Sequence, residues 1–162
     1  MTYRLRVARP EHKFSCAHMT VFDDSRKERL HGHNYTITVE VELREIAFGS
    51  MVELSLIKDC ITSLCDDWKE HLLLAKDNPH FEVINWGRTE LEFRLCGDRY
   101  VVPVDDALLL PIDNVTIEAL SAHAAALLRE RLLPKLPAKI VTAMSVTVAE
   151  TPGQEATTRI AL

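Results

Sequence analysis

Residues 31–43 read HGHNYTITVEVEL, and the alternation of side chains in this stretch is the strongest structural signal in the chain. From residue 35 onward every second side chain is apolar, and Thr or Glu lies between. The apolar set is Tyr35, Ile37, Val39, Val41 and Leu43. Successive side chains of a strand point to opposite faces, so this period of two predicts a long, half-buried strand over residues 31–46.

Two histidines open this strand on its apolar side. His31 and His33 share the parity of the apolar residues, so their side chains project together, roughly 7 Å apart. A third, His18, ends a strand region predicted over residues 3–18, also on its apolar parity. If the two strands pair antiparallel across the polar loop 19–30, the three imidazoles meet. Three nitrogen ligands with a free fourth position are typical of catalytic zinc, so we predict a zinc site.

The other segments complete an α+β pattern. We expect an interruption of the first strand near Pro10 and a helix over 53–72, followed by irregular chain over 75–89. A β-hairpin should follow over 91–104, and then an apolar connector over 108–111. A second helix should run from Asn114 or Thr116 to about Leu133, before a last strand over 140–150. This order predicts an antiparallel sheet with two helices packed on one face, plus an extra β-hairpin.

Composition bounds the class of protein. The 162 residues suit a single domain over 1–162, and an apolar fraction of 47% allows a sizeable core. A net charge of −5 argues against a nucleic-acid partner. No apolar run approaches the roughly 18 residues that cross a bilayer, and we expect no membrane partner and no signal peptide. The four scattered cysteines favour the reducing cytoplasm over a disulfide scaffold.

Glu150 stands at an unusual position on the last strand. It continues the apolar parity of Met144, Val146 and Val148. A carboxylate at the end of a buried face needs hydrogen-bond donors. Glu150 either marks the point where the strand emerges into solvent or accepts N–H groups from a heterocyclic ligand held in a pocket.

Four motifs occur in order along nearly the whole chain. They are FSCAH at 14–18, HGHNY at 31–35, NVTIE at 114–118 and VAET at 148–151. Together they resemble the 6-pyruvoyl-tetrahydropterin synthase family, which includes the 6-carboxytetrahydropterin synthases of queuosine biosynthesis. The resemblance implies the tunnelling fold (T-fold), in which subunits join their sheets into barrels. It also implies a homo-oligomer, usually a hexamer built as a dimer of trimers.

The resemblance also assigns roles to residues. It implies that His18, His31 and His33 bind Zn²⁺ and that Glu150 anchors the pterin. Thr116 and Glu118 would line the pterin pocket.

The sequence departs from the family pattern where the catalysis is expected. The position of the family's catalytic cysteine holds Lys27 in one spacing and Ser25 in another. The family's Asp-His pair corresponds to Lys69-Glu70 or, after a shift of one residue, to Glu70-His71, and the sequence leaves both open.

A glutamate offers a replacement for the missing cysteine. Glu28 matches the pattern E-x-x-H-G-H of a subgroup that cleaves the side chain of a dihydroneopterin-type substrate. Glu28 and His71 are therefore the candidate catalytic bases. Cys16 shares the parity of His18, but a small core residue is the simpler interpretation. We predict that no cysteine acts as nucleophile or base.

These features predict a zinc-dependent lyase similar to 6-pyruvoyl- or 6-carboxytetrahydropterin synthase. It would act on the side chain of a reduced pterin, dihydroneopterin or its triphosphate, by cleaving a carbon–oxygen or carbon–carbon bond. One alternative is a metal- and pterin- or purine-binding protein of the same fold with altered catalysis. Another alternative is a zinc hydrolase with a different heterocyclic substrate.

Overall fold

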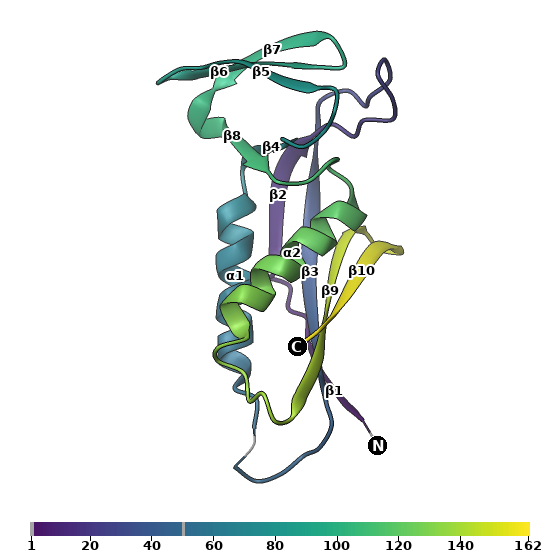
Figure 1. Cartoon of the computed structure of the whole chain (residues 1–162), viewed down its shortest axis with the longest axis vertical. Helices are drawn as coiled ribbons and strands as arrows, with labels where there is room; N and C mark the ends of the chain where they lie inside the picture. Colours follow the sequence, from purple (N-terminus) through teal and green to yellow (C-terminus); the bar gives the residue numbers. More distant parts are fainter. Residues whose placement is uncertain (1, 50) are drawn as a thin grey trace.

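The computed structural model describes residues 2–49 and 51–162, and a seven-stranded sheet dominates it (Figure 1). Six strands follow the order β10-β9-β3-β2-β4-β8, and β1 pairs with β3 beside this path. The strands are β1 (Tyr3–Val7), β2 (Lys13–His18), β3 (His31–Leu43), β4 (His71–Ala75), β8 (Ala107–Leu110), β9 (Val141–Thr151) and β10 (Gln154–Ala161). The helices α1 (Leu54–Trp68) and α2 (Ile117–Leu132) pack on one face.

The long strand predicted over 31–46 is confirmed as β3, over residues 31–43. Its first half pairs antiparallel with β2, and its second half pairs antiparallel with β1. The interruption predicted near Pro10 is confirmed, because the region 3–18 forms two strands, β1 and β2. The chain leaves the sheet between them, around Pro10, whose nitrogen has no hydrogen to donate to a ladder.

The two predicted helices are confirmed, with a correction at the end of the first. The Thr116 hydroxyl caps α2 by accepting a hydrogen bond from the Ala119 backbone nitrogen at 3.3 Å. Helix α1 ends at Trp68 rather than at residue 72, because Lys69 is extended and Glu70 adopts a φ of 61°. His71, predicted to lie on a helix or loop, opens strand β4 instead.

The main sheet is mixed rather than purely antiparallel. Strand β4 pairs parallel with β2 and with β8. The segment 108–111, predicted as a connector, supplies most of β8. Short apolar runs such as LLLA lack the alternation that distinguishes strands, because β4 is covered on both faces. Leu73 faces the helices, whereas Leu72 and Leu74 face a second apolar cluster.

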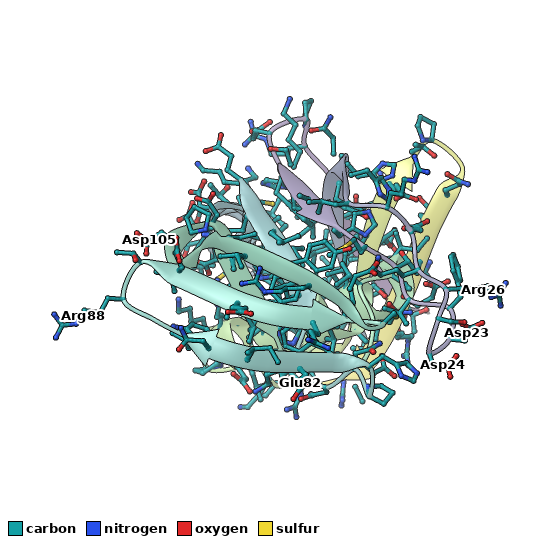
Figure 2. All side chains as sticks on the ribbon, turned by 90° about the horizontal axis from the view of Figure 1, so that it is seen from above. Asp23, Asp24, Arg26, Glu82, Arg88 and Asp105 are labelled. Atoms are coloured by element: carbon teal, nitrogen blue, oxygen red, sulfur yellow. The ribbon has the colours of Figure 1, made fainter. Side chains whose placement is uncertain are left out.

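A three-stranded sheet lies across one end of the main sheet, as Figure 2 shows from above. It consists of β5 (Phe81–Trp86), β6 (Glu90–Leu95) and β7 (Asp98–Pro103), and the short helix η1 (Val104–Asp106) leads on to β8. The predicted hairpin is confirmed as β6–β7. The third strand, β5, lies in the segment predicted to be irregular; it is mostly exposed and carries a bulge, so its sequence shows no clean alternation. We call β5–β7 the small sheet.

The last predicted strand is confirmed as β9, and the chain then turns back as β10. The turn needs Gly153, which has a φ of 86°. Sequence patterning missed β10 because this edge strand is mostly polar and exposed. No helix in the described residues is long and apolar enough to cross a membrane.

Candidate active site

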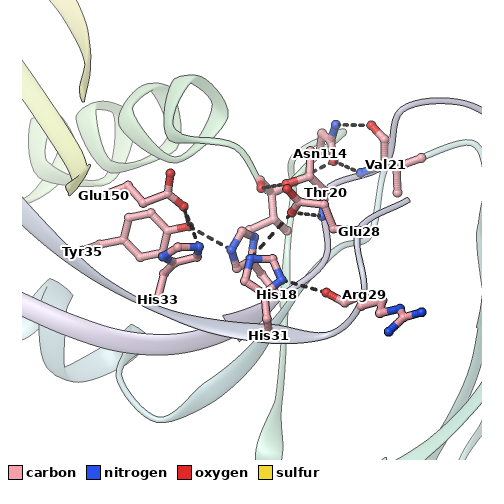
Figure 3. A network of polar contacts seen from close by, with 11 residues as sticks. His18, Thr20, Val21, Glu28, Arg29, His31, His33, Tyr35, Asn114 and Glu150 are labelled. Carbon is pink, nitrogen blue, oxygen red and sulfur yellow. Dashed lines mark hydrogen bonds and ion pairs between the residues drawn. The ribbon is translucent and has the colours of Figure 1, made fainter. Parts of the chain in front are cut away.

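The three predicted histidines converge at the end of the helix-covered face of the sheet (Figure 3). In the β2–β3 register His18 lies opposite His31, and Cys16 lies opposite His33, so the side chains share one face. One candidate ligand atom from each histidine lies within 4.8 Å of the other two. The geometry expected from strand parity is present in the structure.

The chemistry of the three rings fits a divalent metal ion. His31 Nδ1 lies 2.7 Å from the Arg29 carbonyl oxygen, which can only accept a hydrogen bond, so in the neutral ring Nε2 is the nitrogen that can act as a ligand. His18 Nδ1 is buried and has no hydrogen-bond partner in the described residues. Burial and the charge of His31 lower the pKa of His18, which favours the neutral form that binds metal. The cluster therefore has the nitrogen-only ligand set that suits zinc.

Glu28 borders the histidine cluster from the 19–30 loop. Its carboxylate accepts a hydrogen bond from the Thr20 backbone nitrogen at 3.2 Å and lies 3.9 Å from His31 Nε2. Burial opposes ionisation of Glu28, but hydrogen bonding from Thr20 and the charges of His31 and His18 outweigh it and lower the pKa. Glu28 is therefore an anion at neutral pH, in the form that a general base requires.

Asn114 fixes the start of the same loop. Its side-chain oxygen accepts from the Val21 backbone nitrogen at 3.0 Å, and its amide donates to the Val21 carbonyl at 2.8 Å. Sequence reasoning treated Asn114 only as a possible helix cap and missed this role. Its place in the NVTIE motif, beside pocket residues, was the available signal.

Glu150 approaches the cluster from the opposite side, at the end of β9 (Figure 3). Its Oε1 lies 3.2 Å from His33 Nε2 and accepts a hydrogen bond from the Tyr35 hydroxyl at 3.3 Å. The same hydroxyl lies 3.1 Å from His18 Nε2. Tyr35 thus connects a candidate metal ligand with the candidate pterin anchor, a role that the sequence did not indicate.

One pocket of about 130 Å³ brings most of the predicted site residues together. Glu28, Thr116, Glu118 and Glu150 line it, with His18 and Tyr35. Thr116 and Glu118 reach it because the N-terminus of α2 points to this end of the sheet. The structure therefore places residues from β2, the 19–30 loop, α2 and β9 around one small space.

His71 lies elsewhere. It lines a separate pocket of about 450 Å³ with Cys16, Glu70 and Asp106. Its Nδ1 is buried and unpartnered in the described part of the chain. Lys69, from the other candidate pairing, forms an exposed ion pair with Asp66. The structure does not bring His71 into the pocket that His18, Glu28 and Glu150 line.

Cys16 and Cys65 are poorly suited to act as nucleophiles. Cys16 is buried beside the site, and burial, together with the charge of Glu150, raises the pKa of its thiol to about 12. Burial also raises the pKa of Cys65 to about 12. A thiol that stays protonated at neutral pH is a weak nucleophile, which supports the prediction that no cysteine carries the chemistry.

Comparison with known proteins identifies the family. The family model for 6-pyruvoyl tetrahydropterin synthase matches residues 8–161. The chain belongs to the 6-pyruvoyl tetrahydropterin synthase family. It is 31% identical over 121 residues to a Methanocaldococcus jannaschii protein provisionally named as a 6-carboxy-5,6,7,8-tetrahydropterin synthase, covering 74% of this chain and 73% of that one. A Halobacterium salinarum protein of the same provisional name is 31% identical, covering 87% and 78%.

Solved structures of the 6-pyruvoyl tetrahydropterin synthase family confirm the fold class. The crystal structure of the Plasmodium vivax 6-pyruvoyl tetrahydropterin synthase has a TM-score of 0.91 and 26% identity, covering 100% of this chain and 99% of that one. Two variants of that enzyme, with 25% identity, replace a glutamate described as a catalytic residue by cysteine or alanine. The similarity spans the small sheet as well as the tunnelling-fold core.

Proposed function

We propose that this protein is a zinc-dependent lyase that acts on the side chain of a reduced pterin, either dihydroneopterin or its triphosphate. One observation carries the proposal. Two carboxylates, Glu28 and Glu150, approach the three-histidine cluster from opposite sides and line one pocket. A metal with an acidic group on each side can hold a substrate and move its protons.

Glu150 is proposed to hold the pterin ring. A carboxylate accepts two parallel N–H groups, and a pterin presents such groups on its pyrimidine edge. The contacts of Glu150 with Tyr35 and His33 are made by Oε1, and its second oxygen, Oε2, has no hydrogen-bond partner among the described residues. Thr116 and Glu118 would complete the polar wall of the pocket.

His18, His31 and His33 would hold the zinc ion. When bound, zinc polarises nearby hydroxyl or carbonyl oxygens and makes their protons more acidic. Glu28 would accept a proton from the substrate side chain, from oxygen or carbon, because its carboxylate is ionised and adjacent to His31. His71 stays the second candidate base, from its separate pocket.

Two further findings support Glu28. The Plasmodium vivax relative has a glutamate described as catalytic, and in this chain Glu28 is the glutamate nearest the histidine cluster on the loop that precedes His31. The position where the family carries cysteine holds Lys27 or Ser25, and the Cys16 thiol is held neutral by burial.

The test is incubation of purified, zinc-loaded protein with each of the two pterins, with products identified by mass. Loss of side-chain carbon and loss of triphosphate are distinguishable in this way. Glu28→Gln should lower kcat by about 10²–10⁴-fold with metal content unchanged. His31→Ala should lose the metal. Glu82→Gln, an exposed glutamate on β5, serves as the matched control and should behave like the unmodified protein.

The opposite results have clear meanings. A Glu28→Gln variant with normal kcat would exclude Glu28 as the base. If the unmodified, metal-loaded protein binds both pterins but converts neither, the protein is a binding member of the family instead. Full metal occupancy after His31→Ala would exclude the histidine site.

We also propose that the protein is a homo-oligomer, with a hexamer as the expected form. Strands β8 and β10 lie at the two ends of the main sheet's strand order. Unpaired strand edges favour association with further strands. Sheets joined through such edges would extend the sheet between subunits.

A further inference from the structure

Lys27, next to the proposed base, turns away from the pocket and onto the small sheet. Its Nζ lies 2.7 Å from Asp98 Oδ2 and 5.4 Å from the centre of the Tyr100 ring. Only 11% of the Lys27 side chain is exposed, although its partner Asp98 is 67% exposed. A lysine this well covered has one fixed direction rather than the many rotamers of a surface lysine.

The surface that receives Lys27 is itself fixed. Tyr100 stacks on Phe93 with ring centroids 5.1 Å apart and planes 11° apart. Phe93 is fully buried and belongs to the same apolar cluster as Leu72 and Leu74 of β4. The small sheet is therefore packed against the main sheet and provides a firm point of attachment.

The 19–30 loop makes a second contact with the small sheet. Cys96, in the β6–β7 turn, donates from Sγ to the Asp23 carbonyl at 3.4 Å. Figure 2 shows Asp23 and Arg26 beside the end of the small sheet. The tip of the loop and Lys27 are thus both held by the β6–β7 hairpin.

Local backbone geometry links the direction of the Lys27 side chain to that of Glu28. Val21 and Lys27 form an antiparallel bridge, and the Glu28 backbone nitrogen donates to the Thr20 carbonyl at 2.8 Å. In extended chain, neighbouring side chains point to opposite sides. If Lys27 faces the small sheet, Glu28 must face the histidine cluster, where its carboxylate is found.

We propose that Lys27 is a positioning residue: its attachment to Asp98 and Tyr100 on the small sheet orients Glu28 toward the metal site. This inference rests on the proposed function of Glu28 as the base. It also gives the small sheet a role in the active site. Lys27 occupies one of the two positions where the family carries cysteine, and here it orients the neighbouring Glu28.

Stability alone does not explain the arrangement. An ion pair with an exposed partner contributes little to stability. Orientation of a catalytic group is far more sensitive, because a misplacement of about 1 Å can cost roughly 100-fold in rate. Loss of Lys27 should therefore affect kcat much more than folding.

The experiment compares Lys27→Ala with Arg99→Ala, both in zinc-loaded protein. Arg99 is the matched control, because it forms an ion pair with Glu92 on the same small sheet, at 2.7 Å, and has no hydrogen bond or ion pair with the 19–30 loop in the described part of the chain. Lys27→Ala should lower kcat about 10–100-fold with little change in KM or metal content. Arg99→Ala should leave kcat, KM and metal content unchanged. Lys27→Arg should keep most of the kcat of the unmodified protein.

The Glu28→Gln background separates positioning from general damage. If Lys27 acts through Glu28, adding Lys27→Ala to Glu28→Gln should cause no further loss of rate. A kcat within twofold of normal in Lys27→Ala would overturn the proposal. So would a double variant in which Lys27→Ala lowers kcat by the same factor as it does in the unmodified protein.

Hydrogen exchange tests the attachment without any assay of activity. Lys27→Ala should raise the exchange rate of the Glu28 amide, bonded to the Thr20 carbonyl, by tenfold or more, and Arg99→Ala should not. Unchanged exchange in Lys27→Ala overturns the attachment. If the unmodified protein converts neither pterin, the proposed function fails, and this measurement still decides whether Lys27 holds the loop.

Discussion

Tyr35→Phe removes a single hydroxyl group from the floor of the pocket and leaves the ring in place. The ring is buried, with 1% of its surface exposed, and stacks on Phe14 with centroids 5.3 Å apart. Burial and the charge of Glu150 raise the pKa of Tyr35, so the hydroxyl keeps its proton and donates to Glu150 at any physiological pH. The substitution therefore tests one hydrogen bond to the proposed pterin anchor without opening a cavity.

The structure bounds the size of the effect. A hydrogen bond to a charged group contributes about 1.5–3 kcal/mol, and less where the group is partly solvated. The Glu150 side chain is 23% exposed and keeps its 3.2 Å contact with His33 Nε2. We therefore expect a loss of about 1–2 kcal/mol in pterin binding. This corresponds to a rise in the pterin Kd of about 5–30-fold.

Pterin fluorescence titration of the zinc-loaded protein measures this Kd, and metal analysis checks that the site is intact. If the hydroxyl acts through Glu150, the double variant with Glu150→Gln should bind only slightly more weakly than Glu150→Gln alone. A pterin Kd for Tyr35→Phe within twofold of normal, at full metal content, would refute the reasoning. So would a double variant in which the two losses simply add.

Two further predictions concern stability and assembly. Burial lowers the pKa of His123 below 6.5, and its ring stacks on Trp68 at 5.8 Å between the two helices. Below about pH 6.5 the unfolded chain therefore binds more protons than the folded one, and the free energy of unfolding falls as the pH drops. Urea unfolding of His123→Gln should show a shallower fall of the free energy of unfolding. Part of the fall should remain, because burial also lowers the pKa values of His12 and His18. An unchanged slope would contradict this prediction. Sedimentation at micromolar concentration should show a species of several subunits of 18.4 kDa, most simply six, and a stable monomer would contradict the association of the β8 and β10 edges.

Local patterns in the sequence were enough to predict the cluster of three histidines. The alternation in β3 fixes which side chains share a face, and His18, His31 and His33 all lie on the buried parity of their strands. Strand parity is a short-range property of the backbone, so it can be read without knowing the rest of the fold. The position of Glu150 on β9 followed from the same rule.

Long-range packing decided what the sequence left open. Strands β4 and β8 carry apolar side chains on both faces, so no periodicity marked them. Strand β4 pairs parallel with β2, with His71 opposite Cys16, and His71 lines a different pocket from His18, Glu28 and Glu150. No local signal connects Lys27 with Asp98, 71 residues further along, or Val21 with Asn114, 93 residues further along. The sequence by itself determined the face on which the candidate metal ligands lie, because alternation is local. Only the tertiary structure decided which loop, helix and small sheet hold the candidate base beside the three histidines. Those contacts join segments that are close only after the chain has folded.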